Sequence, residues 1–223
     1  MLLRFKIFFV TLSLAFAAVA STDADVTVSV DSSQNWRGFM NVFETDESTY
    51  VFGQEWGFND LSAVFGLNDL TLGPAPIGTD DAFWYGDTAG GPDRVGNKFM
   101  DAAGYVEVTD AFGGMNVTFS GTVLSDSFTS AHTAVAYIRD FAPDYSSFVE
   151  NTVALAPGDF TVSLMTNSDA GRHVQYGFNV KGVNVWPDDV GNFGNVVIRA
   201  VPEPGSLSFL GLAGIAVLAR RRR

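Results

Sequence analysis

Histidine is the first residue type to weigh for chemistry, because imidazole readily takes up and gives back a proton near neutral pH. The chain has only His132 and His173, on separate stretches of strand-like sequence. It has neither the G-x-S-x-G motif of serine hydrolases nor the H-E-x-x-H motif of zinc proteases. A glycosidase needs only two carboxylates that meet in the fold, so a secreted carbohydrate-active enzyme stays open as the alternative. The sequence therefore predicts a protein that is not an enzyme.

Carboxylates gather in one segment, residues 73–98, which is rich in Gly, Pro and Asp. Its four aspartates are Asp80, Asp81, Asp87 and Asp93. Hard oxygen ligands suit Ca²⁺, although the spacing here does not match an EF-hand loop. Two hypotheses follow: a candidate Ca²⁺ site, or a solvated acidic loop with no cofactor.

Aromatic residues offer a second kind of binding chemistry, since a flat ring can stack on the C–H face of a sugar. Trp84 and Tyr85 lie together inside the acidic segment, which favours an exposed platform for a polysaccharide. The other tryptophans, Trp36, Trp56 and Trp186, have hydrophobic neighbours and are predicted to pack in a core. Trp84 and Tyr85 are therefore the candidate carbohydrate-binding residues.

The charge distribution excludes one class of partner. Residues 21–219 hold only seven of the 13 basic residues but all 25 acidic ones, a formal charge of −18. Nucleic-acid binding needs a basic surface, so no nucleic-acid partner is expected. The chain also lacks cysteine, which excludes a thiol nucleophile and cysteine-based metal sites.

Strand periodicity dominates the body of the chain. In residues 174–181, Val174, Tyr176, Phe178 and Val180 alternate with more polar residues, and residues 115–123 and 160–164 show the same period. Residues 134–141 are apolar on both parities, as in a strand covered on both sides. Turn-forming residues separate these runs, and no long helical pattern intervenes. Residues 21–200 are therefore predicted to form an all-β domain, an antiparallel, jelly-roll-like β-sandwich.

The first 20 residues have the order of a secretory signal peptide. Arg4 and Lys6 precede an apolar run over residues 7–17, and Ala18 and Ala20 frame a small-x-small cleavage site. The alternative is an uncleaved anchor helix. We expect a signal-peptide helix over residues 1–20 and a mature chain that starts at residue 21.

The last 22 residues form a second export signal in three parts. Residues 202–206 read PEPGS, and the two prolines prevent this segment from continuing a helix or a sheet, so it is expected to be extended. Residues 207–219 are apolar, and as a helix they would span roughly 20 Å of the ~30 Å hydrocarbon core. Four arginines at 220–223 would stay on the cytoplasmic side. The sequence predicts a short transmembrane helix, against the alternative of a core helix with a basic end.

This tripartite tail, residues 201–223, resembles the PEP-CTERM sorting signal of exported bacterial proteins, also labelled the ice-binding protein C-terminal domain. The resemblance implies processing by exosortase, a membrane protease-transpeptidase, with a transient stay in the inner membrane. The implied sorting residues are Pro202, Glu203, Pro204, Arg220, Arg221, Arg222 and Arg223. Residues 36–198 resemble the bodies of uncharacterised PEP-CTERM proteins, a likeness that carries no activity.

Together these features predict a membrane-anchored precursor that becomes a cell-surface or extracellular-matrix protein. Its expected role is structural or adhesive, with weak binding of exopolysaccharide. The alternatives are the secreted enzyme and a surface protein without any ligand.

Overall fold

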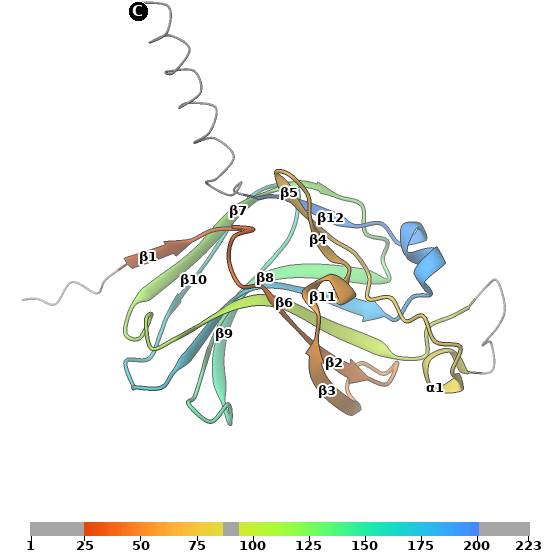
Figure 1. The fold of residues 1–223 in the computed structure, drawn as a ribbon, viewed down its shortest axis with the longest axis horizontal. Coiled ribbons are helices and arrows are strands. Elements are labelled where there is room, and N and C mark those ends of the chain that lie inside the picture. The colour runs from red at the N-terminus through yellow and green to blue at the C-terminus, as the bar shows by residue number, and fades with distance from the viewer. Residues whose placement is uncertain (1–24, 87–93, 201–223) are drawn as a thin grey trace, which may run out of the picture.

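The computed structural model describes residues 25–86 and 94–200 (Figure 1). The predicted signal peptide, the sorting tail, Asp87 and Asp93 lie outside these residues. Within the described part, strands make up most of the regular structure and form two six-stranded sheets. No helix in this part is long and apolar enough to cross a membrane. The predicted all-β sandwich is confirmed.

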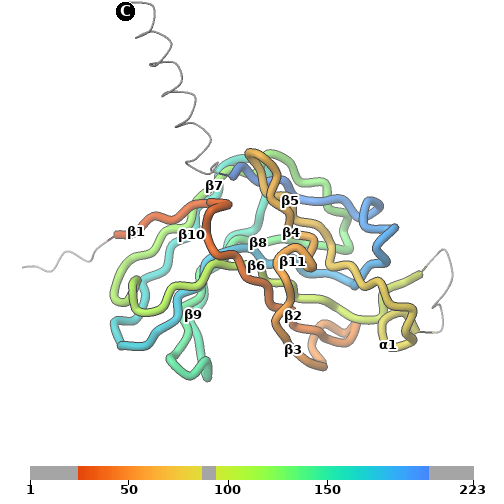
Figure 2. The backbone as a smooth tube through the Cα atoms, in the orientation of Figure 1, coloured from red at the N-terminus to blue at the C-terminus, as the bar shows by residue number. Residues whose placement is uncertain are grey.

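The first sheet, called here the front sheet, is antiparallel throughout. Its order is β3 (Tyr50–Trp56), β2 (Arg37–Phe43), β6 (Phe99–Thr109), β11 (His173–Val183), β8 (His132–Phe141) and β9 (Phe148–Ala154). The β2–β3 and β8–β9 hairpins project on the same side of the molecule (Figure 2).

The second sheet, the back sheet, is built around β7. Its strands are β4 (Ala63–Phe65), β5 (Asp69–Leu72), β12 (Val196–Arg199), β7 (Asn116–Asp126), β10 (Gly158–Met165) and β1 (Asp25–Val28). Strand β1 runs parallel to β7, so the antiparallel prediction is wrong for this pair. No hairpin joins β1 to β7, and the connection therefore does not impose an antiparallel direction.

The last eight strands pair in a nested order: β8 with β9, β7 with β10, β6 with β11, and β5 with β12. This nested order arises when one long hairpin folds over so that its paired strands form two facing sheets. It is the jelly-roll arrangement. Strands β2, β3 and β4 extend the two sheets beyond this unit.

The main core lies between the inner faces of the sheets. Phe119 of β7 contacts Phe160, Tyr176 and Phe178, with ring centroids 5.2–5.4 Å apart. The alternating residues of β11 face this core, as their period predicts. On β8, core-facing Ile138 and outward-facing Tyr137 are both fully buried, but Val135, Arg139 and Phe141 on the outer face are partly exposed. The prediction of a strand covered on both faces therefore holds at Tyr137 and not along the whole strand.

A second core occupies the end of the molecule near the Gly/Pro/Asp-rich segment. Ala75, Ile77 and Tyr85 pack there with Met40 and Met100 of the front sheet. The segment includes a single-turn helix, α1 (Ala82–Tyr85), and it adjoins two 3-10 turns, η1 (Phe58–Leu61) and η3 (Pro187–Asn192). Much of this segment is therefore packed structure and not an exposed loop.

Candidate functional site

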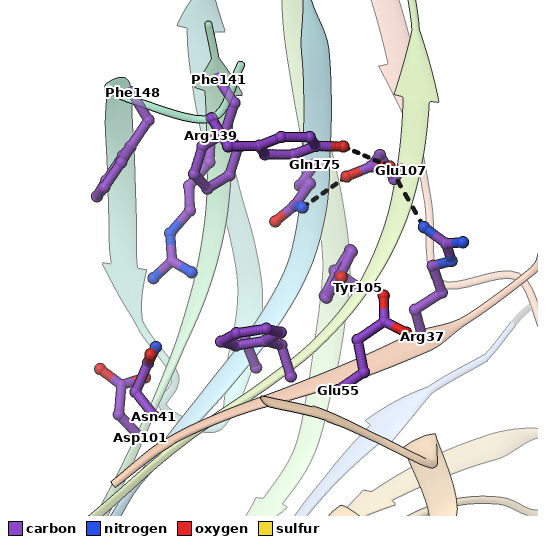
Figure 3. Close-up of a pocket in the computed structure, with 13 residues that line it drawn as sticks. Arg37, Asn41, Glu55, Asp101, Tyr105, Glu107, Arg139, Phe141, Phe148 and Gln175 are labelled. Atoms are coloured by element: carbon purple, nitrogen blue, oxygen red, sulfur yellow. Dashed lines mark hydrogen bonds and ion pairs between the residues drawn. The ribbon is translucent and has the colours of Figure 1, made fainter. Parts of the chain in front are cut away.

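A groove of about 590 Å³ crosses the outer face of the front sheet (Figure 3). Its residues come from β3, β2, β6, β11 and β8, the β8–β9 turn and β9. Strand register explains why they meet: residues paired across adjacent antiparallel strands point to the same face. Arg37, Tyr105, Gly177 and Tyr137 form one such row, and Glu107, Gln175, Arg139 and Glu150 form the next.

Two tyrosines flank a glycine at the centre of the groove face. Tyr105 is 5% exposed and Tyr137 is fully buried, although both lie on the outer face of a sheet. Between them stands Gly177, where a Cβ would come within 2.1 Å of Gly104 O. Because backbone crowds this point, a side chain here would force β6 and β11 apart.

Arg139 covers the buried tyrosine. Its guanidinium carbon lies 4.2 Å from the centre of the Tyr137 ring, and its Nε donates a hydrogen bond to Glu150. A cation over an aromatic face is a favourable contact. Burial raises the pKa of Tyr137, because a phenolate would lose its hydration there.

A hydrogen-bond network fixes Glu107 at one end of the groove (Figure 3). Its Oε1 accepts from Arg37 Nη1 at 3.3 Å and from Tyr145 Oη at 3.2 Å, and its Oε2 accepts from Gln175 Nε2 at 2.7 Å. Burial, followed by the nearby Glu107 carboxylate, raises the pKa of Tyr145. The carboxylate is therefore held in place by three donors from separate parts of the sheet.

One wall of the groove is aromatic. Phe141, Tyr145 and Phe148 lie around the β8–β9 hairpin, with ring centroids 5.5 Å and 5.0 Å from Phe141. Tyr145 is 49% exposed and Phe148 is 52% exposed, so both present apolar surface to solvent. Tyr145 also stacks on His173, with ring centroids 4.4 Å apart.

The opposite wall comes from β2 and β3. Phe39, Asn41 and Glu55 line it, and Asp101 of β6 lies beside Asn41 at the lower end (Figure 3). Asp101 Oδ2 pairs with Lys181 Nζ at 3.2 Å. Among the described residues, the Glu55 carboxylate has neither an ion-pair nor a hydrogen-bond partner. The groove thus combines aromatic faces with polar groups held in fixed positions.

The sequence pointed instead to Trp84 and Tyr85, and the expected exposure is wrong for Tyr85. Tyr85 is 1% exposed, and its Oη donates to Ile77 O at 2.5 Å. Trp84 is half-buried and contacts Phe52 edge-on. The single turn of α1 directs Tyr85 into the second core, because burying a large aromatic ring stabilises the fold more than exposing it.

The predicted calcium ligands are only partly within the described residues. Asp80 lies 3.6 Å from Arg94 in an ion pair, and Asp81 accepts a hydrogen bond from Phe83 N as the N-cap of α1. In residues 25–86 and 94–200, no group of three or more His, Cys, Asp or Glu side chains is arranged to hold a metal ion. With Asp87 and Asp93 outside that part, the calcium hypothesis stays a prediction.

The two histidines lie at opposite ends of the front sheet. His132 is 4% exposed, lies 3.0 Å from Val183 O and packs between Phe128 and Phe193. His173 Nδ1 lies 2.8 Å from Thr109 Oγ1. On adjacent strands they pair with Gly182 and Phe141 respectively, so they do not form a joint site.

Sequence reasoning missed most of the groove. The signal was present in β6, where Asp101, Tyr105 and Glu107 share one parity while apolar Ala102 and Val106 occupy the other. An aromatic residue among charged ones on a presumed solvent face marks a candidate binding surface.

Comparison with known proteins adds information on the tail alone. No curated protein and no solved structure matches this chain. The predicted sorting residues and the residues of the signal cleavage site, Ala18 and Ala20, lie outside the described part of the structure. The sequence of residues 200–223 nevertheless matches a known family, and the chain carries there a PEP-CTERM protein-sorting motif.

Proposed function

We propose that this protein is an exosortase-sorted, exported surface or matrix protein that binds polysaccharide in the front-sheet groove and is not an enzyme. The PEP-CTERM motif supports export and processing by exosortase. The groove supports binding, and the two arguments are independent of each other.

One observation carries the binding proposal: the outer face of the front sheet presents exposed aromatic rings beside fixed polar groups. A sheet face that only meets water needs no such rings. A sugar has apolar C–H faces and polar hydroxyl edges, and it can therefore use both kinds of surface. Phe148 and Tyr145 offer rings, while Glu107, Gln175 and Arg37 offer hydrogen-bonding groups within the same groove.

The alternative is a carbohydrate-active enzyme, because the carboxylates of Glu55 and Glu107 line the same groove. A glycosidase needs one carboxyl group that gives up its proton and a second that acts as nucleophile or base. Glu107 accepts three hydrogen bonds, which hold its carboxylate in one position and leave it less free to move toward a substrate. This favours binding over catalysis. Release of reducing sugar that is lost in Glu55→Gln would favour the enzyme instead.

The test of binding is retention of the purified protein on a panel of immobilised polysaccharides. We expect Phe148→Ala to weaken retention about fivefold, since it removes one stacking surface from a half-exposed position. Val149→Ala is the matched control: Val149 is 51% exposed on the same strand but has the opposite parity. Equal behaviour of the two variants would reject the groove as the binding site.

The test of sorting is the intact mass of the protein from its native host, fractionated into membrane, matrix and medium. Processing near Pro202–Pro204 yields a chain without Arg220–Arg223 in the matrix or the medium. A membrane-bound chain that keeps all four arginines would show that the tail is a plain anchor.

A further inference from the structure

We infer that the groove takes a neutral, hydroxyl-rich glycan and discriminates against anionic polysaccharides, with Asn179 and Glu55 as the residues that decide this choice. The inference rests on the proposed function and names the ligand class of the same groove. Two separate observations carry it, the charge balance of the groove face and a set of unpartnered polar groups below it.

Each cation that the described residues place on the groove face is paired with a carboxylate. The pairs are Arg37 with Glu107, Arg139 with Glu150, and Lys181 with Asp101. An anionic sugar would have to compete with these protein carboxylates for each cation. A guanidinium that is already paired offers little net attraction to a further carboxylate, because the existing partner cancels most of its field.

Glu55 turns this balance negative. Its exposed carboxylate lines the groove and has no cation partner among the described residues. Within residues 25–86 and 94–200, the groove face therefore has four carboxylates against three cations. Like charge close to a binding surface lowers the affinity for an anion, most strongly at low ionic strength.

Unpartnered polar atoms lie below the groove in a diagonal line across three strands. They are Asp101 Oδ1 on β6, both amide atoms of Asn179 on β11, and Tyr137 Oη on β8, each without a hydrogen-bond partner among the described residues. Register places all three side chains on the groove-facing side of the sheet. Asn179 is 1% exposed, and leaving such a buried amide unpaired is unfavourable, because it has lost its hydrogen bonds to water without gaining others.

The chemistry of these atoms selects hydroxyl groups. Asp101 Oδ1 only accepts, whereas the amide of Asn179 both donates and accepts. Because these atoms are buried, a glycan hydroxyl reaches them only after the side chains above them shift. It then donates to Asp101 Oδ1 and exchanges both roles with the Asn179 amide. A carboxylate or sulfate ligand has no proton to donate to Asp101 Oδ1. These unpartnered polar atoms therefore favour a neutral sugar as the ligand.

Matched ligand pairs test this inference with the full processed protein. Each pair shares a backbone and differs in charge: hydroxyethyl- and carboxymethylcellulose, dextran and dextran sulfate, methyl-esterified and de-esterified pectin. We expect tighter binding to the neutral member of whichever pair binds. Tighter binding to the anionic member, weakened by Phe148→Ala, would overturn the ligand class and leave the proposed function standing. Absence of binding to all six would overturn both.

Two variants test the named residues. Glu55→Gln should raise affinity for the anionic member about threefold at low salt, because it removes one like charge. Asp159→Asn on the back sheet is the control, since it changes net charge equally but keeps an acceptor for Thr122 Oγ1. Asn179→Leu should weaken neutral-glycan binding about fivefold while preserving or raising Tm, because it removes an unpaired buried amide. A Glu55→Gln variant indistinguishable from Asp159→Asn would overturn the role of Glu55. A folded Asn179→Leu variant with unchanged affinity would overturn that of Asn179.

Discussion

The ion pair between Asp140 and Arg172 ties the β10–β11 loop to the end of the sandwich, and we predict that Arg172→Met destabilises the protein strongly. Asp140 is completely buried, and its Oδ1 accepts from Arg172 Nε at 2.8 Å. Its Oδ2 accepts from Asn167 N at 2.7 Å, and Arg172 Nη2 donates to the Asp140 carbonyl at 2.9 Å. Arg172→Met keeps most of the side-chain volume and removes the charge that neutralises the carboxylate.

The expected loss follows from the burial of the partner left behind. Removing one member of a buried pair costs about 3–5 kcal/mol, because the remaining charge stays uncompensated in the interior. For a domain of this size, ~4 kcal/mol corresponds to a fall in Tm of roughly 8–16 °C. Asp140→Asn should cost less, about 1–3 kcal/mol, since the amide retains an acceptor and the Arg172 side chain, 11% exposed, can reach water.

Urea denaturation of the two single variants and the double variant measures this asymmetry and the coupling between the residues. Lys181→Met is the control, because Lys181 is 43% exposed in its pair with Asp101 and its loss should cost about 1 kcal/mol or less. If Arg172→Met costs no more than Lys181→Met, Asp140 is not a buried charge that depends on its partner, and the reasoning is refuted.

Two further predictions concern titration and backbone packing. Burial lowers the pKa of His132 below 6.5, so the folded protein binds its proton more weakly than the unfolded chain. The free energy of unfolding should therefore fall as pH drops below about 6.5. Urea denaturation between pH 7 and 5 should show a smaller fall in His132→Gln than in the unmodified protein. An equal fall in both proteins would contradict this. Hydrogen bonds, the strongest of them from the Thr49 hydroxyl, lower the pKa of Asp46 to about 2. The stability that these bonds contribute is therefore lost only at much lower pH than the His132 contribution, as Asp46 becomes protonated. Gly177→Ala should cost about 3 kcal/mol or more and abolish glycan retention, because its Cβ meets the Gly104 carbonyl; calorimetry showing an unchanged Tm would argue against this crowding.

Period-2 alternation proved sufficient to locate strands such as β7, β10 and β11, because one face of each is buried in the main core. The prediction did not single out β6, whose Ala102, Ala103 and Gly104 blur the contrast between faces. Periodicity also gave no pairing partners. The parallel β1–β7 pair and the nested jelly-roll order depend on contacts between distant segments.

The sorting motif and the groove show what each level of information determined. The motif is a continuous string of residues, and its proline breaker, apolar run and arginines can be recognised without a fold. The groove brings residues from Arg37 to Gln175 onto one face, and only the register of six strands aligns them. Local sequence favoured Trp84 and Tyr85, but packing of α1 against the second core buries Tyr85. The sequence determined which strands have one solvent-facing side, because the alternation of side chains is a local property. Tertiary structure decided which of these strands lie next to each other and in what register, because strand pairing joins residues far apart in the chain.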